Sequence, residues 1–176
     1  MLGAILGGWF ALCGPEMPTL LRLIIMFLLC AVGGCLWAMI AAALKAYWNV
    51  NETIVTLMMN YIALLFLDYL CYGPWMAAKQ TTPVSEEIPN SMQLSNLGNT
   101  TINAGILIAV VIAVLLYIFF RATTAGYQME VIRNSRKTAE YAGINVRKHI
   151  LIVLGLSGAI AGLAGFVQIT GVVHRV

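Results

Sequence analysis

Long apolar segments separated by short polar ones dominate this sequence. Four of them, about 20–44, 54–72, 102–120 and 149–173, are long enough to cross a bilayer as an α-helix, which needs roughly 20 apolar residues. Segment 1–12 is equally apolar but shorter, and we expect it to be the end of a longer helix. These runs do not alternate as barrel strands would, and lipid admits only helices and closed barrels. The sequence therefore predicts an all-α, polytopic transmembrane helical bundle of about four full spans plus a partial N-terminal one.

The polar segments between the spans indicate how this single membrane domain, residues 1–176, lies in the membrane. Segment 73–101 is rich in Pro, Ser, Thr and Asn, whereas segment 121–148 carries six of the ten Lys and Arg residues. With Lys45, seven basic residues lie on one side of the predicted bundle and the remaining three lie on the other. Because basic residues concentrate on the cytoplasmic side of membrane proteins, we predict that 121–148 is cytoplasmic and that 73–101 is an external loop.

The composition agrees with a membrane protein and argues against an enzyme. Hydrophobic residues make up 61% of the chain and charged residues 10%, against about 25% charged in soluble domains. The four cysteines lie in or beside apolar segments without metal-ligand spacing, so we interpret them as small apolar residues and expect no metal site. The sequence contains no Ser/His/Asp, HExxH or paired-carboxylate arrangement and no Gly-Lys-Ser/Thr phosphate loop, so we expect no catalytic residues. His149, at a predicted interface, is interpreted as an anchor rather than a base.

A short helix is predicted within the basic segment. In NSRKTAEYAG, residues 134–143, Asn134 can cap the N-terminus and Gly143 can end the helix in a left-handed conformation. Asn145 can then cap the next long helix. The short helix is too polar to cross a bilayer, so it would either contact a cytoplasmic partner or remain a solvated charged segment. The residues that could make this contact are Asn134, Ser135, Thr138, Ala139, Glu140, Tyr141, Ala142 and Gly143.

The last span carries glycines at three- and four-residue spacing: Gly155, Gly158, Gly162 and Gly165. Small residues let transmembrane helices approach closely, and this matters because lipid provides no hydrophobic drive for helix association. The glycines therefore predict a static packing face, or a helix that slides or tilts against its neighbours. The two interpretations are compatible.

Two polar residues, Thr56 and Asn60, lie inside the second predicted span. An amide about two turns into a membrane must find a hydrogen-bond partner or line a polar cavity. Both alternatives stay open for Asn60: a hydrogen bond to another helix, or the lining of a translocation pathway.

Three segments together resemble a known family of membrane proteins. They are VNETIVTLMMNYIA at 50–63, TTAGYQMEVIRNSRKTAEYAGINVRK at 123–148 and LSGAIAGLAG at 156–165. They are similar to the permease subunits of bacterial ABC importers, in the nucleoside branch of the ribose and branched-chain amino acid permease family. That branch works with lipoproteins of the basic-membrane-protein type. The resemblance covers about residues 36–171.

The resemblance implies a transport mechanism in the bacterial cytoplasmic (inner) membrane. A permease of this family pairs with a second permease subunit around a central pathway and receives its solute from an extracytoplasmic substrate-binding lipoprotein. Cytoplasmic ABC ATPase subunits bind the ATP, so the chain needs no cofactor of its own, and no nucleic acid is involved. Carried over to this chain, 134–143 is the coupling helix that the ATPase contacts. Thr56 and Asn60 are then candidates for the pathway.

The sequence departs from the family in two respects. Relatives often have Arg-Ala-Val-Gly before the residue that corresponds to Asn134, where this chain has Glu-Val-Ile-Arg at 130–133. The missing glycine would change the turn into the coupling helix. Family members also have about twice as many spans, so we expect the chain to be part of a longer permease. A truncated, non-transporting membrane scaffold is the alternative.

Overall fold

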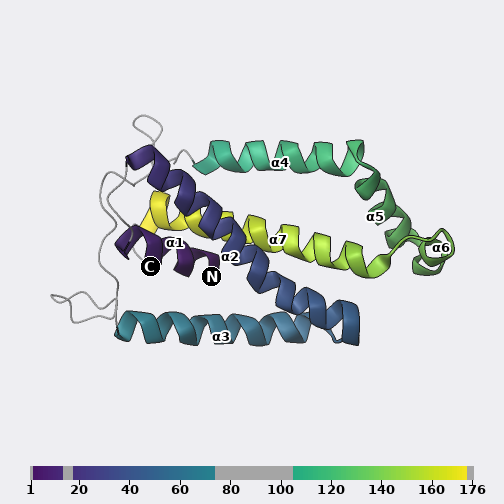
Figure 1. The fold of residues 1–176 in the computed structure, drawn as a ribbon, viewed down its shortest axis with the longest axis horizontal. Helices are drawn as coiled ribbons and strands as arrows, with labels where there is room; N and C mark the ends of the chain where they lie inside the picture. Colours follow the sequence, from purple (N-terminus) through teal and green to yellow (C-terminus); the bar gives the residue numbers. More distant parts are fainter. Residues whose placement is uncertain (1, 14–17, 74–104, 174–176) are drawn as a thin grey trace.

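The computed structural model describes residues 2–13, 18–73 and 105–173, and these are almost entirely helical. The helices are α1 (Leu2–Cys13), α2 (Thr19–Trp48), α3 (Glu52–Tyr72), α4 (Gly105–Ala122), α5 (Thr124–Asn134), α6 (Arg136–Tyr141) and α7 (Val146–Gln168), followed by the π-helical segment η2 (Ile169–Val173) (Figure 1). No strand occurs in these ranges, so the predicted all-α fold is confirmed. The predicted external loop lies outside the described residues, except for Gly73.

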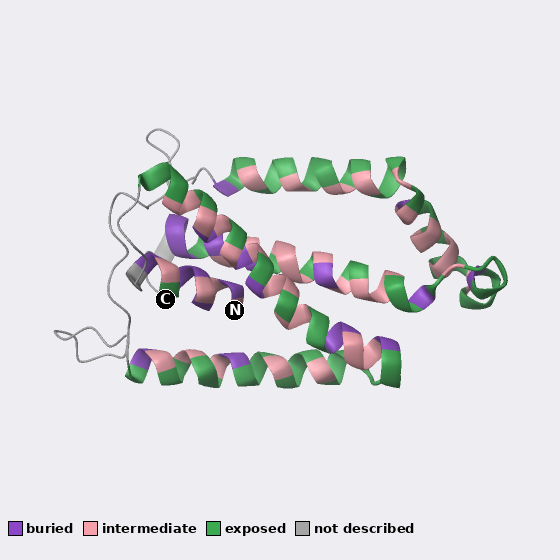
Figure 2. Cartoon of the chain, viewed as in Figure 1, coloured by how far each residue is buried: buried purple, intermediate pink, exposed green. Residues whose placement is uncertain are grey.

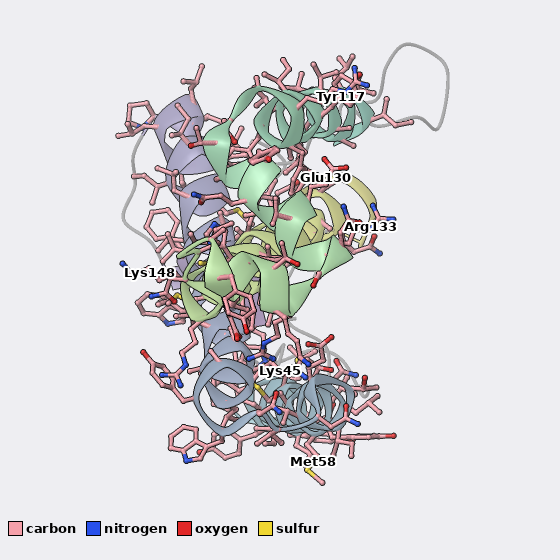
Figure 3. The ribbon with its side chains drawn as sticks, turned by 90° about the vertical axis from the view of Figure 1, so that its right-hand side faces the viewer. Lys45, Met58, Tyr117, Glu130, Arg133 and Lys148 are labelled. Atoms are coloured by element: carbon pink, nitrogen blue, oxygen red, sulfur yellow. The ribbon has the colours of Figure 1, made fainter. Side chains whose placement is uncertain are left out.

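Four helices in the described ranges are long and apolar enough to cross a membrane: α2, α3, α4, and α7 with its extension to Gly171. They alternate in direction, so that the end of α2, the start of α3, the end of α4 and the start of α7 gather at one end of the molecule, together with α5 and α6 (Figure 1). We call this the basic end, and Figure 3 looks onto it. Its basic residues are Lys45, Arg121, Arg133, Arg136, Lys137, Arg147 and Lys148.

The spans α2 and α7 extend furthest beyond the predicted limits, because of their caps. Helix α2 continues to Trp48 and ends where Asn49 adopts a φ of 52°, a left-handed conformation that Asn tolerates better than most residues. Helix α7 begins at Val146, because the side chain of Asn145 accepts a hydrogen bond of 3.3 Å from the backbone N–H of Lys148. The predicted cap at Asn145 is confirmed.

The core is formed by α1, α2 and α7. Met26 and Cys30 of α2 are fully buried and pack with Ala11 of α1 and Phe166 of α7. The rings of Phe27 and Phe166 meet edge to face, with centroids 5.6 Å apart. Helices α3 and α4 flank this core and are exposed along most of their length, as Figure 2 shows.

Helices α2 and α7 cross at a contact made by glycines. A Cβ atom on Gly158 would collide with the backbone of Gly34, and one on Gly162 would collide with the carbonyl oxygen of Cys30. A Cβ atom on Gly34 would in turn collide with the carbonyl oxygen of Gly158. The two backbones are therefore in direct contact, an arrangement that side chains larger than hydrogen would prevent.

The other two predicted packing glycines have different surroundings. A Cβ atom on Gly165 would lie 2.9 Å from the Cβ of Ala4, so this glycine faces α1 rather than α2. A Cβ atom on Gly155 would lie 3.4 Å from Sγ of Cys35, an ordinary van der Waals distance. The glycines thus contact two helices, and the packing is loosest at Gly155, toward the basic end.

The difference between Gly155 and Gly162 gives a matched pair of substitutions. Both replacements by Ala raise helix propensity equally, but only Gly162→Ala forces a methyl group into the backbone of α2. We expect Gly162→Ala to destabilise the fold by about 1–3 kcal/mol, the usual cost of overpacking, and Gly155→Ala to be neutral or stabilising. The measurement is the midpoint of thermal unfolding in detergent, followed by circular dichroism. Equal midpoints for the two variants would contradict the contact described above.

Candidate functional site

Helix α5 is joined to the membrane helix α4 by a tight turn at Thr123. The Thr123 hydroxyl donates to the carbonyl oxygen of Phe119 at 2.6 Å and accepts the backbone N–H of Gly126 at 3.2 Å, which caps α5. A Cβ atom on Gly126 would collide with the backbone of Phe120, so the start of α5 lies directly against the end of α4. The turn fixes the direction in which α5 leaves α4.

Helix α6 begins one residue later than the sequence suggests. Asn134, predicted as its cap, is the last residue of α5, so that prediction is wrong. The cap is Ser135, which has an extended backbone and accepts the backbone N–H of Thr138 at 3.3 Å. Asn134 and Ser135 are both good cap residues, and α5 continues through Arg133 to Asn134, so the cap role moves to Ser135. Arg133 is therefore part of a continuous helix.

The C-terminal end of α6 closes as predicted. Gly143 has a φ of +75°, and its backbone N–H donates to the carbonyl oxygen of Glu140 at 3.1 Å. The backbone N–H of Ile144 donates to the carbonyl oxygen of Ala139 at 3.0 Å, which completes a Schellman motif. With Ser135 at one end and this motif at the other, both ends of the six-residue helix are fixed.

The predicted contact residues divide into an inner and an outer set. Ala139 is fully buried and holds α6 against the rest of the basic end, and Ser135 is half-buried. Tyr141 is 93% exposed, the highest value among the exposed large apolar and aromatic side chains of the described residues. The other exposed members are Asn134, Thr138, Glu140, Ala142 and Gly143. Helix α6 is therefore anchored on one face and presents an aromatic side chain on another.

A hydrogen bond between Gln128 of α5 and His149 of α7 connects α5 to the last span. Nε2 of His149 lies 3.0 Å from Oε1 of Gln128, and Nδ1 lies 3.0 Å from the carbonyl oxygen of Asn145. A carbonyl oxygen only accepts, so Nδ1 donates to Asn145. The Gln128 amide has a donor end and an acceptor end, so it can supply whichever partner Nε2 requires. This role was not predicted for His149, because the two residues are 21 positions apart and neither belongs to a local motif.

Two of the cavities beside these elements are compared with the predicted site residues. One, of about 290 Å³ at the basic end, is lined by Glu52 of α3, Arg133 of α5 and His149 of α7. The other, of about 190 Å³, lies deeper and is lined by both predicted pathway residues, Thr56 and Asn60, and by glycines of the α2–α7 contact. The predicted pathway residues and packing residues therefore share one cavity. The predicted coupling residues line neither of the two.

The deep polar residues differ in their hydrogen bonding. The Thr56 hydroxyl donates to the carbonyl oxygen of Glu52 at 2.8 Å, within its own helix. The Asn60 side chain is exposed and has no hydrogen bond within the described residues, so the interhelical bond considered for it is absent there. The described ranges also contain no group of three or more His, Cys, Asp or Glu residues that could hold a metal ion.

The link between Gln128 and His149 can be tested with a double-mutant cycle. We expect Gln128→Leu and His149→Leu each to lower the free energy of unfolding, with a coupling energy of about 0.5–1.5 kcal/mol, the net value of one hydrogen bond. The measurement is unfolding in detergent of the two single variants and the double variant. Gln168→Leu, near the other end of α7, is the matched control and should not couple to His149. Strictly additive effects of Gln128→Leu and His149→Leu would show that the bond does not stabilise the protein.

The chain is similar in sequence to a known family of membrane proteins and to several of its members. Residues 1–175 match the family described as "Branched-chain amino acid transport system / permease component". The chain is 30% identical to the nucleoside ABC transporter permease protein NupB of Lactococcus lactis over 176 residues, covering 95% of the chain and 48% of the relative. It is 31% identical to the guanosine ABC transporter permease protein NupP of Bacillus subtilis, covering 94% and 50%.

A relative with a different named solute is equally similar. The glucose ABC transporter permease protein TsgB13 of Haloferax volcanii is 31% identical over 182 residues, covering 97% of the chain and 48% of the relative. The chain thus spans about half the length of the curated relatives it matches. No solved structure matches it significantly. The match over almost the entire chain shows that it belongs to the family of permease components of branched-chain amino acid transport systems.

Proposed function

We propose that this chain forms part of the translocation pathway of an ABC importer for nucleosides or a related small polar solute, driven by separate ATPase subunits. The observation that carries the proposal is helix α6: a short helix with both ends fixed, at the basic end, connected to membrane helices on both sides. A segment of this kind can transmit force, because a load on α6 reaches the spans through fixed turns rather than through a flexible loop.

A force applied to α6 can reach the membrane-spanning helices by two routes. Through α5 and the Thr123 turn it reaches α4, and through the Asn145 cap it reaches α7. The bond between Gln128 and His149 connects the two routes, so α4 and α7 would respond together to movement of α6. Helix α7 then meets α2 at the glycine contact, which adjoins the cavity of Thr56 and Asn60. Movement at the basic end would in this way alter the cavity.

The proposed partners follow from the same arrangement. A cytoplasmic ABC ATPase would contact the exposed side of α6 and bind the ATP, so the chain itself would need no cofactor. A second permease subunit and lipid would cover the exposed apolar faces of α3 and α4. A substrate-binding lipoprotein would deliver the solute at the end opposite to the basic end. The gathering of seven basic residues supports a cytoplasmic position for the basic end in a bacterial inner membrane.

The proposed solute rests on the named relatives. Two of the three described above carry nucleoside or guanosine in their names, and the third carries glucose. All three names describe ABC transporter permeases, which supports transport rather than catalysis.

Charge on the exposed side of α6 should abolish coupling. We expect Tyr141→Asp with Ala142→Asp to reduce copurification of the ATPase subunit by about tenfold or more, because burying unpaired carboxylates in an interface costs more than the 1.4 kcal/mol that a tenfold change represents. Tyr72→Asp, at an exposed position where α3 ends away from the basic end, is the control and should leave recovery unchanged. Undiminished recovery with the α6 variant would favour the alternative of a membrane scaffold without coupling.

The orientation of α6 can be tested in intact cells. A Tyr141→Cys variant should resist a membrane-impermeant maleimide until the membrane is permeabilised, whereas a Tyr72→Cys variant should react at once. Both side chains are largely exposed, so access across the membrane decides the labelling rather than burial. Immediate labelling at position 141 would place α6 outside the cell, where no ATPase could reach it.

A further inference from the structure

The cavity that contains Thr56 and Asn60 has a composition suited to one kind of ligand. It lies where α1, α2, α3 and α7 meet and has a volume of about 190 Å³. Its larger side chains include Trp37 of α2 and Met59 of α3, and most of the remaining wall consists of glycine and alanine. The wall is thus largely apolar, with an indole and one free amide. Small-molecule sites commonly have this character: an apolar lining with a few placed polar groups.

The polar groups available in this cavity are few. The carboxamide of Asn60 and the indole N–H of Trp37 have no hydrogen-bond partner within the described residues. The Thr56 hydroxyl already donates to the carbonyl oxygen of Glu52 and is left only as an acceptor. An amide without a partner is costly away from water. The Asn60 side chain is exposed and lies within a membrane-spanning helix, so a ligand or water in a pathway can supply its hydrogen-bond partner.

We infer that this cavity is a subsite for a planar heteroaromatic ring, such as the base of a nucleoside. The volume supports a ring, because a cavity of roughly 150 Å³ in another protein holds benzene. An indole provides a stacking surface for any base, and the sulfur of Met59 is polarisable and favours contact with aromatic rings. A carboxamide offers one donor and one acceptor side by side, the pattern with which Asn pairs with the edge of adenine.

The same cavity is poorly suited to a hexose. Each sugar hydroxyl needs its own donor and acceptor partners, and a site that leaves them unpaired loses the hydrogen bonds that water had supplied. One amide, one indole N–H and one acceptor hydroxyl cannot satisfy a ring that carries hydroxyls around its edge. This reasoning separates the two solute classes named among the relatives. It rests on the proposed transport function, whose solute it specifies.

Saturation-transfer difference NMR of the chain in phospholipid nanodiscs tests the inference directly, without selection by a binding protein. The probes are adenosine and glucose, and empty nanodiscs provide the background. We expect saturation of the base protons of adenosine to exceed that of its ribose protons, and glucose to remain at background. Trp37→Leu and Asn60→Leu should each weaken adenosine binding about fivefold to tenfold, through loss of the stacking surface or of the amide pair.

Two control variants separate recognition from folding. Trp37→Phe retains an aromatic surface and should keep most of the binding. Trp48→Leu changes an exposed tryptophan at the basic end and should have no effect. Glucose saturation equal to that of adenosine would overturn the inference. A Trp37→Leu variant that binds adenosine as well as Trp48→Leu would also overturn it.

Failure of this inference is distinguishable from failure of the proposed function. The same preparation is tested for copurification of the ATPase subunit. A chain that recovers the ATPase but does not bind adenosine overturns the ring subsite alone. A chain that binds adenosine through Trp37 and Asn60 but recovers no ATPase supports the subsite and overturns the proposed coupling.

Discussion

The direct backbone contact between α2 and α7 is the constraint on which the remaining structure depends. Lipid gives helices no hydrophobic reason to associate, so they are held by close van der Waals packing. Gly34, Gly158 and Gly162 make such packing possible, and they also line the 190 Å³ cavity. The same glycines therefore form the helix contact and part of the cavity wall. A change in the angle between α2 and α7 cannot leave the cavity unchanged.

The basic end depends on a different kind of interaction. Outside the apolar core, hydrogen bonds of caps and turns define the geometry: Thr123 between α4 and α5, Ser135 at α6 and Asn145 at α7. The exposed ion pair between Arg136 and Glu140, with 3.2 Å between Nε and Oε1, adds little stability because both side chains are more than half exposed. The shape of the basic end is thus determined by hydrogen bonds to backbone groups and by the burial of Ala139, rather than by ion pairs.

Short sequence patterns predict those parts of the structure that depend only on neighbouring residues in the chain. Long apolar runs predict the spans, Asn145 predicts a cap, and Gly143 predicts a left-handed helix end. The cap at Ser135 was missed because Asn134 is an equally good candidate and only the extent of α5 decides between them. The sequence does not predict helix α5, since TAGYQMEVIRN contains Gly and β-branched residues of low helix propensity.

Contacts between distant residues could not be predicted from local signals. Gln128 and His149 meet only because the turn at Thr123 directs α5 from the end of α4 toward the start of α7 (Figure 1). Trp37 lies in an apolar segment that gave no reason to single it out, and its place beside Asn60 depends on how α2 crosses the bundle. The packing of the helices, rather than the helix propensity of single residues, brings Gln128 close to His149 and Trp37 close to Asn60. The orientation of α6 relative to the membrane depends on the bilayer and is indicated only by charge.

The short length of the segment from α5 to α6 has a consequence for variation within the family. An α-helix advances by about 100° per residue, so inserting or deleting one residue within α5 would rotate everything after it around the helix axis. Ala139 would leave its buried position, and Tyr141 would point in another direction. Substitutions can be absorbed at many exposed positions here, but a change of length cannot. Members of the family in which α5 and α6 are arranged in this way should therefore align across the segment without gaps, even where few of their residues are identical.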